Sequence, residues 1–275
     1  MWLRSKGFVD RVHTWWNRHS FVGTPSFMLA KKLMALKEGI VQWNRQEFGN
    51  VGRQKKQLLE ELKTLDAKEG DLGFSDGEKC HREDLRSQVE HLLSLEEISW
   101  RQKSRMLCIK EGNNNTKFFH KMANSHKRFN YLRTLEVDGV VFEKDSEVSN
   151  QVVQFYKNLY KEIEGWRPLV EGLEFDRIGN MERLWLERKF ERDEILQVVS
   201  DLDGDKALGP DGFTMAFYHH CRRVMEKDIL AVFEEFFHHC KFEKSLNATF
   251  TALIPKKNDA SNIGDFRPIS LVGSV

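Results

Sequence analysis

The sequence predicts a mostly α-helical protein with a small α+β part. Apolar residues recur at spacings of three and four through the first third of the chain, which is typical of amphipathic helices. Short β-prone runs flank turn residues further on, and helical spacing returns before two strand-like runs near residue 275. A length of 275 residues allows one or two domains. No run of 18 apolar residues occurs, so no membrane span is expected.

Residues 1–98 are expected to form a helical linker that contains an antiparallel helical hairpin. Thr24 and Pro25 form a typical helix start, with an N-cap residue followed by proline at the first helical position. Turn-rich residues 70–77 separate two later stripes, which favours a hairpin over residues 53–98. The three apolar stripes consist of Leu29, Leu33, Leu36, Ile40 and Trp43, then Val51, Leu58, Leu62 and Leu65, then Leu85, Val89 and Leu92.

Residues 99–170 open with a basic segment and continue with short elements. After a loop at 111–115, Thr116 is placed to start a helix. The pair Asp138-Gly139 lies between β-prone residues and predicts a hairpin turn. Asp145 is expected to cap the next helix, and the apolar pattern fades near residues 166–168, where we place a boundary.

Residues 171–275 are predicted to be mixed. Asp193 is expected to cap a helix. A loop at 206–213 contains Gly209 and Gly212, for which we expect positive φ. Two helical segments are expected at 215–225 and 228–240, followed by strand-like runs at 249–257 and 265–275.

Charge is segregated along the chain, although the net charge is only +1. Residues 53–98 hold 8 basic and 12 acidic side chains, a net charge of −4, whereas residues 99–134 hold 9 basic and 1 acidic, a net charge of +8. Clustered Lys and Arg are typical of nucleic-acid binding, and Phe119 or His120 could stack on bases. Alternatively, these bases pair with the acidic residues at 60–97 and only decorate a helix.

The cysteine and histidine pattern does not favour metal binding or secretion. The four cysteines have no CxxC spacing and residues 1–20 have no apolar signal core, so we expect reduced thiols in a nuclear or cytoplasmic protein that is not secreted. Neighbouring residues on a helix diverge by about 100°, so the two His-His-Cys runs at 219–221 and 238–240 are not expected to bind a metal.

Several ordered motifs carry a family resemblance. They are SWRQKSR, KEGNNNTKFFH, DKALGPDGF, SLNATFTALIPKK and IGDFRPISLVGSV. Together they resemble the reverse transcriptase region of LINE-type (non-LTR) retrotransposons, especially those of plants, over nearly the whole chain. In that resemblance, residues 1–98 correspond to the linker after an endonuclease, 99–170 to the segment before the polymerase core, and 171–275 to a truncated start of the fingers subdomain.

The resemblance implies two sets of contact residues. Lys256, Lys257 and Arg267 resemble the fingers positions that hold the triphosphate of the incoming nucleotide. The residues alone favour a solvated lysine pair and an arginine paired with Asp265. The basic segment resembles a region that contacts template RNA. Its candidate residues, with Lys206 of the later loop, are Arg101, Lys103, Arg105, Lys110, Lys117, Lys121, Lys127, Arg128 and Lys206.

The resemblance also implies that this chain has no polymerase activity alone. Polymerases of this family hold two Mg²⁺ ions with palm aspartates, some of them in a Tyr-x-Asp-Asp hairpin, and this sequence contains no such motif. We therefore expect no catalytic residue, no metal and no cofactor here, with an RNA template or RNA/DNA hybrid as the partner. Two alternatives remain: the hairpin at 53–98 binds a protein partner, or a downstream exon or chain supplies the palm.

Overall fold

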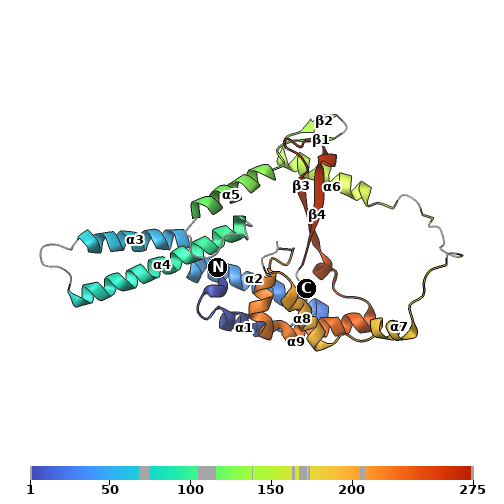
Figure 1. Ribbon diagram of the computed structural model, residues 1–275, viewed down its shortest axis with the longest axis horizontal. Helices are drawn as coiled ribbons and strands as arrows, with labels where there is room; N and C mark the ends of the chain where they lie inside the picture. The colour runs from blue at the N-terminus through green and yellow to red at the C-terminus, as the bar shows by residue number, and fades with distance from the viewer. Residues whose placement is uncertain are drawn as a thin grey trace. The chain divides into compact units, whose positions relative to one another are not determined.

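The computed structural model describes residues 2–67, 75–104, 116–137, 139–162, 165–166, 172, 174–204 and 208–273, without the side chains of residues 47, 48 and 116. The chain divides into two compact units. Unit 1 comprises Met1–Lys127, Arg192–Phe250 and Leu271–Val275, and unit 2 comprises Arg128–Glu191 and Thr251–Ser270. Helices dominate the described residues and the strands form two small sheets (Figure 1), so the predicted fold class is confirmed.

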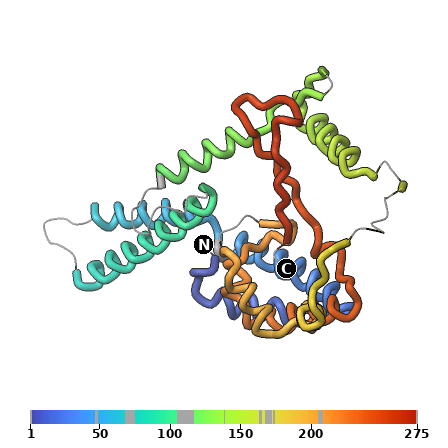
Figure 2. Tube along the Cα trace, turned by 45° about the vertical axis from the view of Figure 1, so that its right-hand side comes forward, coloured from blue at the N-terminus to red at the C-terminus, as the bar shows by residue number. Residues whose placement is uncertain are grey.

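Unit 1 is helical and is built from segments far apart in the sequence. Helices α1 and α2, near the N-terminus, pack against each other and against α9, which also contacts α8 (Figures 1 and 2). The helices of this unit are α1 (Phe8–Arg18), α2 (Pro25–Trp43), α3 (Val51–Ala67), α4 (Asp76–Ser104), most of α5 (Thr116–Phe129), α8 (Arg192–Asp201) and α9 (Met215–His239), with the 3₁₀ helices η1 (Trp2–Arg4) and η3 (Lys244–Asn247).

The first predicted stripe forms the centre of the unit 1 core. The hydroxyl of Thr24 accepts a hydrogen bond from the backbone N–H of Phe27 at 3.4 Å, and Pro25 is the first residue of α2, so the predicted start is confirmed. The whole stripe from Leu29 to Trp43 is buried, against Phe8 and Val12 of α1 and apolar residues of α9. A π-helix, η2 (Asn44–Phe48), extends α2 to Gly49, whose φ of +69° ends it.

Helices α3 and α4 pack against each other along much of their length. Leu85, Val89, Leu92 and Leu95 of α4 are buried, and they recur at spacings of four and three. No residue of α3 is fully buried, because its apolar side chains line a single seam on an otherwise charged helix. The pair is therefore a slender two-helix element with a polar exterior.

Three details of the helices differ from the sequence predictions. Residues 215–239 form one helix instead of two, because no glycine or proline interrupts them and buried Met225 and Ile229 continue the stripe. Asp145 is the first residue of α6 rather than its cap, which is Lys144. Asp193 lies inside the first turn of α8, where its negative charge still favours the helix dipole.

The loop before α9 needs its two glycines for different reasons. Gly212 has a φ of +81°, as predicted, but Gly209 has no positive φ. A Cβ atom at Gly209 would lie 2.1 Å from the carbonyl oxygen of Val272, so this position requires the absence of a side chain. Gly209 thus allows the loop to lie directly against the end of β4 (Phe266–Val272).

Unit 2 contains the predicted hairpin. Strands β1 (Leu135–Val137) and β2 (Val140–Phe142) pair antiparallel, Leu135 opposite Phe142. Gly139 has a φ of +79°, as a tight two-residue turn requires, while Asp138 lies outside the described residues. Leu135, Val148 and Ile263 form a small core. The remaining elements are α6 (Asp145–Leu159), α7 (Asn180–Leu186), η4 (Ile263–Asp265) and most of β3 (Thr249–Pro255), which pairs with β4.

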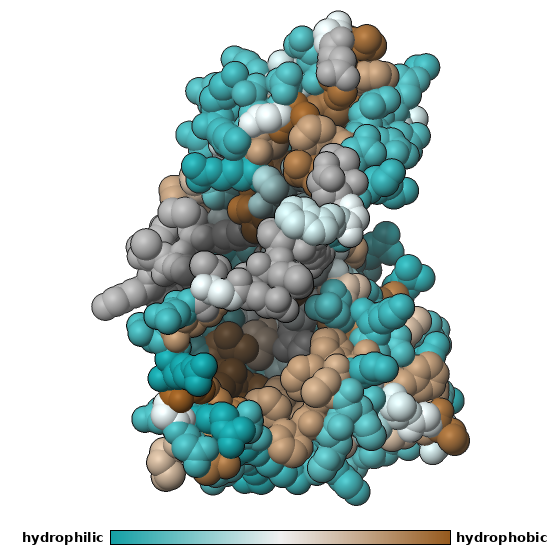
Figure 3. All heavy atoms as spheres, turned by 90° about the vertical axis from the view of Figure 1, so that its right-hand side faces the viewer, coloured by the Kyte–Doolittle hydropathy of each residue, from teal (hydrophilic) through white to brown (hydrophobic). Residues whose placement is uncertain are grey.

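The surface mixes hydrophilic and apolar side chains, as the face in Figure 3 shows. The largest exposed apolar residues include Met181 and Trp185 of α7, whose exposed fractions are 76% and 62%. Among the described helices, none combines the length and the apolar character needed to cross a membrane.

Two carboxylates of α9 fasten α1 and α2 to it. Asp228 accepts hydrogen bonds from the indole N–H of Trp16 at 2.8 Å and from the ammonium of Lys32 at 2.8 and 2.9 Å. Glu235 accepts from the backbone N–H and the hydroxyl of Ser26 at 2.6 and 2.9 Å. The two carboxylates are seven residues apart, so they lie on the same face of α9.

We predict that Asp228→Ala lowers the free energy of unfolding by about 2–3 kcal/mol, because it leaves the buried indole N–H of Trp16 and the ammonium of Lys32 without their shared acceptor. Urea unfolding followed by circular dichroism measures this. Asp193→Ala is the control, since that side chain is 91% exposed, and it should change the value by less than about 1 kcal/mol, the size of its helix-dipole effect. If both variants had the same free energy of unfolding, Asp228 would not be the shared acceptor that holds α1 and α2 on α9.

Candidate nucleic-acid interface

The predicted nucleic-acid residues that the structure describes lie on two helices. Arg101 and Lys103 are in the last turn of α4, whereas Lys117, Lys121, Lys127 and Arg128 are on α5. Arg105, Lys110 and Lys206 lie outside the described residues.

Three of the basic residues of α5 share one exposed face, here called the cationic ridge. It consists of Lys117, Lys121 and Arg128. At about 100° per residue, Lys121 and Arg128 lie about 40° and 20° around the helix from Lys117. At about 1.5 Å per residue, they lie about 6 and 17 Å along it. The ridge therefore presents three positive charges in a line, with Arg128 near the C-terminal end of the helix.

No acidic side chain neutralises the lysines of α5 within the described part of the chain. Helix α5 itself contains no Asp or Glu, and no ion pair among the described residues involves Lys117, Lys121 or Lys127. An unpaired row of lysines on a helix surface is a good site for a polyanion.

The acidic block pairs instead with bases of its own two helices. The ion pairs within α3 and α4 are Lys55–Glu96, Lys56–Glu60, Lys79–Asp76, Arg82–Asp66 and, when the histidine is protonated, His81–Glu61. In the alternative interpretation of the sequence, acidic residues at 60–97 pair with the basic segment. The five acidic residues named here pair instead within α3 and α4.

The aromatic residues of α5 divide between an inner and an outer position. Phe119 is 1% exposed, so the prediction that it is available for stacking is wrong. It lies about 160° around the helix from Lys121, on the face turned away from the ridge. Its neighbour Phe118 is 37% exposed and contacts the Phe119 ring edge-on, at 5.8 Å between centroids and 70° between planes.

Trp100 organises the junction between α4 and α5. Its indole stacks on the imidazole of His120, with centroids 3.4 Å apart and 29° between planes. The ammonium of Lys103 lies 4.5 Å from the centroid of the same indole, which is cation–π geometry. Sequence reasoning did not select Trp100, although a tryptophan three residues before a lysine on a helix is the signal for this contact.

Of the predicted nucleotide-phosphate residues, Lys256 and Lys257 lie on a turn of unit 2 and Arg267 lies near the start of β4. Lys256 donates from Nζ to the carbonyl oxygen of Gly264 at 2.7 Å, and Lys257 pairs with Asp265 at 3.0 Å. Arg267 is exposed, and in the described residues its predicted alternative partner, Asp265, pairs with Lys257 instead. The hydrogen bond and charge of Lys257 hold the pKa of Asp265 below 3.8.

The rest of unit 2 holds this turn in place. The backbone N–H of Glu136, in β1, donates to the carbonyl oxygen of Ser261 at 2.8 Å. The backbone N–H of Lys256 donates to the carbonyl oxygen of Asp265 at 2.8 Å, and Ile263 is buried beside Leu135. Lys256 and Lys257 are therefore brought together on a supported turn.

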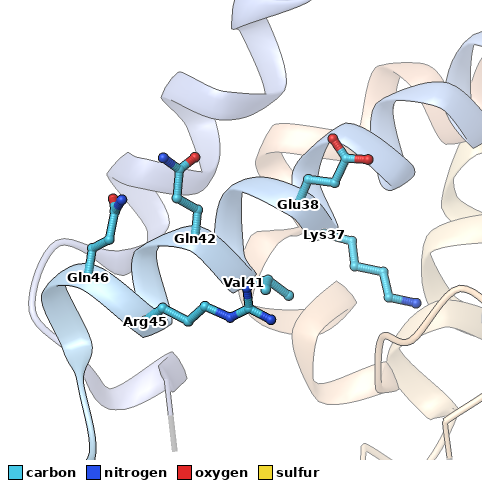
Figure 4. Close-up of a pocket in the computed structure, with 6 residues that line it drawn as sticks. All are labelled: Lys37, Glu38, Val41, Gln42, Arg45 and Gln46. Carbon is cyan, nitrogen blue, oxygen red and sulfur yellow. The ribbon is translucent and has the colours of Figure 1, made fainter.

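An open pocket of about 490 Å³ lies along α2 and η2 (Figure 4). Its lining residues are Lys37, Glu38, Val41, Gln42, Arg45 and Gln46. All six come from one continuous helical stretch, and none was predicted as a site residue. Two positive charges and one carboxylate give it no strong preference for a charged ligand.

The described residues offer no metal site, since no three His, Cys, Asp or Glu side chains converge in them. His219 contacts the carbonyl oxygen of Val199 at 2.7 Å, and burial raises the pKa of the Cys221 thiol to about 12. A thiol with that pKa stays protonated at neutral pH, which makes it a poor ligand and a poor nucleophile.

Comparison with known proteins gives one weak similarity. Over 177 residues, which cover 62% of this chain, the sequence is 25% identical to the Transposon TX1 uncharacterized 149 kDa protein of Xenopus laevis. The match spans only 13% of the length of that protein. No protein-family model matches the chain. The similarity supports a transposon-related origin.

We predict that Lys257→Ala raises the pKa of Asp265 toward 3.8, because the substitution removes the hydrogen-bond donor and the nearest positive charge. Because the pKa of Asp265 is lowered on folding, its pair with Lys257 stabilises the folded turn fully above about pH 3.8. This stabilisation is lost as the pH falls through the lower pKa of the folded state. Carboxyl-carbon NMR titration of Asp265 measures the change. Lys241→Ala, at an exposed position of unit 1, should leave it unaltered, and an unmoved pKa in Lys257→Ala would rule out the pair.

Proposed function

We propose that this chain is a fragment of a LINE-type retrotransposon reverse transcriptase and that it binds template RNA through the cationic ridge of α5. The observation that carries the proposal is the row of lysines at positions 117 and 121, exposed and without an acidic partner among the described residues. The ordered motifs of the sequence and the weak similarity to a transposon protein support the family assignment.

The physical basis of binding is phosphate neutralisation. Lysine ammonium groups are compact point charges that release the counterions of a nucleic acid when they contact its phosphates. Lys103, Lys127 and Arg128 extend the same positive field on either side of Lys117 and Lys121. Affinity from such contacts does not depend on sequence, as suits a protein that must move along its template.

The hairpin of α3 and α4 serves this function as a spacer. The leucines at positions 85, 92 and 95 of α4 are buried and several charged residues pair within the hairpin, so it offers little apolar surface to a protein partner. We assign to it the role of a rigid spacer before α5.

Lys256, Lys257 and Arg267 are proposed to hold the triphosphate of an incoming nucleotide in a complete polymerase. Two lysines on a supported turn, with an exposed arginine near the start of β4, fit that chemistry, because an arginine fork and lysine point charges both neutralise phosphate. Without palm carboxylates beside them, these residues would bind phosphate without transferring it.

We predict that Lys117→Glu with Lys121→Glu weakens the binding of RNA by about tenfold or more at low salt, because two phosphate contacts become repulsive. Fluorescence anisotropy with a labelled RNA at several salt concentrations measures the affinity. The slope of log affinity against log salt should become shallower by about 1.4, the value for two lost contacts to a single strand.

The matched control is Lys157→Glu with Lys161→Glu. These lysines have the same spacing of four, are exposed in unit 2 and have no ion pair among the described residues, so the change in net charge is identical. They should affect RNA affinity much less. Equal losses in both double variants would mean that net charge alone determines binding, and wild-type binding without a salt slope would end the proposal.

We also predict that the purified 275-residue chain does not extend a primer on an RNA template with Mg²⁺ and deoxynucleotides. The reason is that its four tyrosines include none in a Tyr-x-Asp-Asp sequence, so the paired carboxylates of a two-metal site are missing. Gel analysis of a labelled primer measures extension. Metal-dependent extension by the pure chain would contradict this prediction.

A further inference from the structure

The cationic ridge of α5 has an aromatic ring on each side. Phe118 lies about 60° around the helix from Lys121, and His120 lies about 60° from Lys117 in the opposite direction. The lysines therefore occupy a strip between two rings. This alternation of positive charge and aromatic surface is typical of proteins that bind unpaired nucleic acid.

Phe118 has the properties of a stacking residue. More than a third of its surface is exposed, whereas the next residue, Phe119, is buried and supports it edge-on. Exposure of the Phe118 ring to water is unfavourable, so a ligand that covers the ring gains free energy. The contact with the buried ring of Phe119 holds Phe118 in position. A nucleobase could cover the outer surface of Phe118 without a rearrangement of α5.

The ring on the other side is also held in place. His120 is only partly exposed because the indole of Trp100 covers one of its faces, and Lys103 lies on the same indole. This stack fixes the edge of the strip at the junction of α4 and α5. It adds a second flat surface next to Lys117.

We propose that α5 binds RNA as an unpaired strand, with Lys117 and Lys121 on the phosphates and Phe118 stacked on a base. This inference rests on the proposed function and adds to it the form of RNA and the residue that selects it. A duplex offers the same phosphates to the lysines, but its bases are stacked on one another and cannot cover Phe118. Selection for unpaired RNA therefore depends on Phe118. The charge-dependent part of the affinity comes from the lysines and does not depend on Phe118.

The experiment compares the complete chain with its Phe118→Leu variant. Two RNAs of equal length are titrated, one an unstructured strand and the other a self-complementary duplex. Leucine keeps the side chain apolar but removes the flat ring, so affinity for the strand should fall about fivefold to tenfold, at the lower end of the range for losing one stacked base. Affinity for the duplex should not change.

A second measurement reports stacking directly. A strand that contains 2-aminopurine loses fluorescence when this base stacks on an aromatic ring. Wild-type protein should quench the signal at some position along the strand, and Phe118→Leu should abolish the quenching even at saturating protein. A merely structural role for Phe118 would weaken binding without removing the quenching of the bound strand.

Phe236→Leu is the matched control. Phe236 is 39% exposed on α9 and meets Phe242 edge-on at 5.6 Å and 67°, nearly the same geometry as Phe118 on Phe119. It lies on α9 and not on the cationic ridge of α5, so its substitution should leave both RNA affinities unchanged. Circular dichroism confirms that both variants are folded.

The outcomes separate this inference from the function on which it rests. Salt-dependent RNA binding that is equal for strand and duplex, or unaffected by Phe118→Leu, would overturn the inference and leave phosphate binding by the ridge intact. Failure of the wild-type chain to bind either RNA would overturn both. A loss confined to the unpaired strand, together with loss of quenching, supports the proposal.

Discussion

The architecture of unit 1 depends on two carboxylates on one face of α9. Asp228 and Glu235 bind groups of α1 and α2 that lie roughly 200 residues earlier in the chain. Each carboxylate accepts more than one hydrogen bond. The hydroxyl of Ser26, which donates to Glu235, also accepts a hydrogen bond from the backbone N–H of Glu243 at 2.8 Å. Apolar burial alone does not fix how helices rotate against each other, whereas these directional bonds do. They therefore fix how α1 and α2 are seated on α9 within unit 1.

Charge is distributed so that one segment is neutralised and another is not. Glu96 and Asp66 pair with Lys55 and Arg82 inside the α3–α4 pair, where the partners are partly shielded from solvent. The lysines of α5 have no such partners in the described part of the chain. A net charge near zero for the whole protein thus coexists with a local positive field, which acts at distances up to about the Debye length of 8–10 Å.

Local patterns in the sequence predicted local structure well. The stripe from Leu29 to Trp43 and the turn at Gly139 follow from side-chain periodicity and backbone sterics, which depend on near neighbours only. The break expected between residues 225 and 228 was wrong because charged residues in the middle of a helix do not stop it.

The site was harder to predict because it depends on which face of a helix is turned inward. Phe118 and Phe119 are adjacent residues of the same type, and only the packing of α5 determines that Phe119 is buried and Phe118 is exposed. The stack of Trp100 on His120 joins α4 to α5, so neither residue reveals it alone. In the same way, Asp265 pairs with Lys257 rather than Arg267 because β3 and the turn after it place that lysine closer.

The partners of Lys256 and Lys257 determine how the turn of unit 2 could receive a phosphate. Each ammonium already contacts an oxygen of the turn, so a triphosphate would have to replace the carbonyl of Gly264 and the carboxylate of Asp265. Solvent-exposed ion pairs contribute little to stability, so the exchange costs little. Arg267 is exposed and engages no acidic partner among the described residues, so it can meet a phosphate without giving up a bond. In the proposed function, a phosphate would then meet the arginine before the lysines, which first have to leave the oxygens of their own turn.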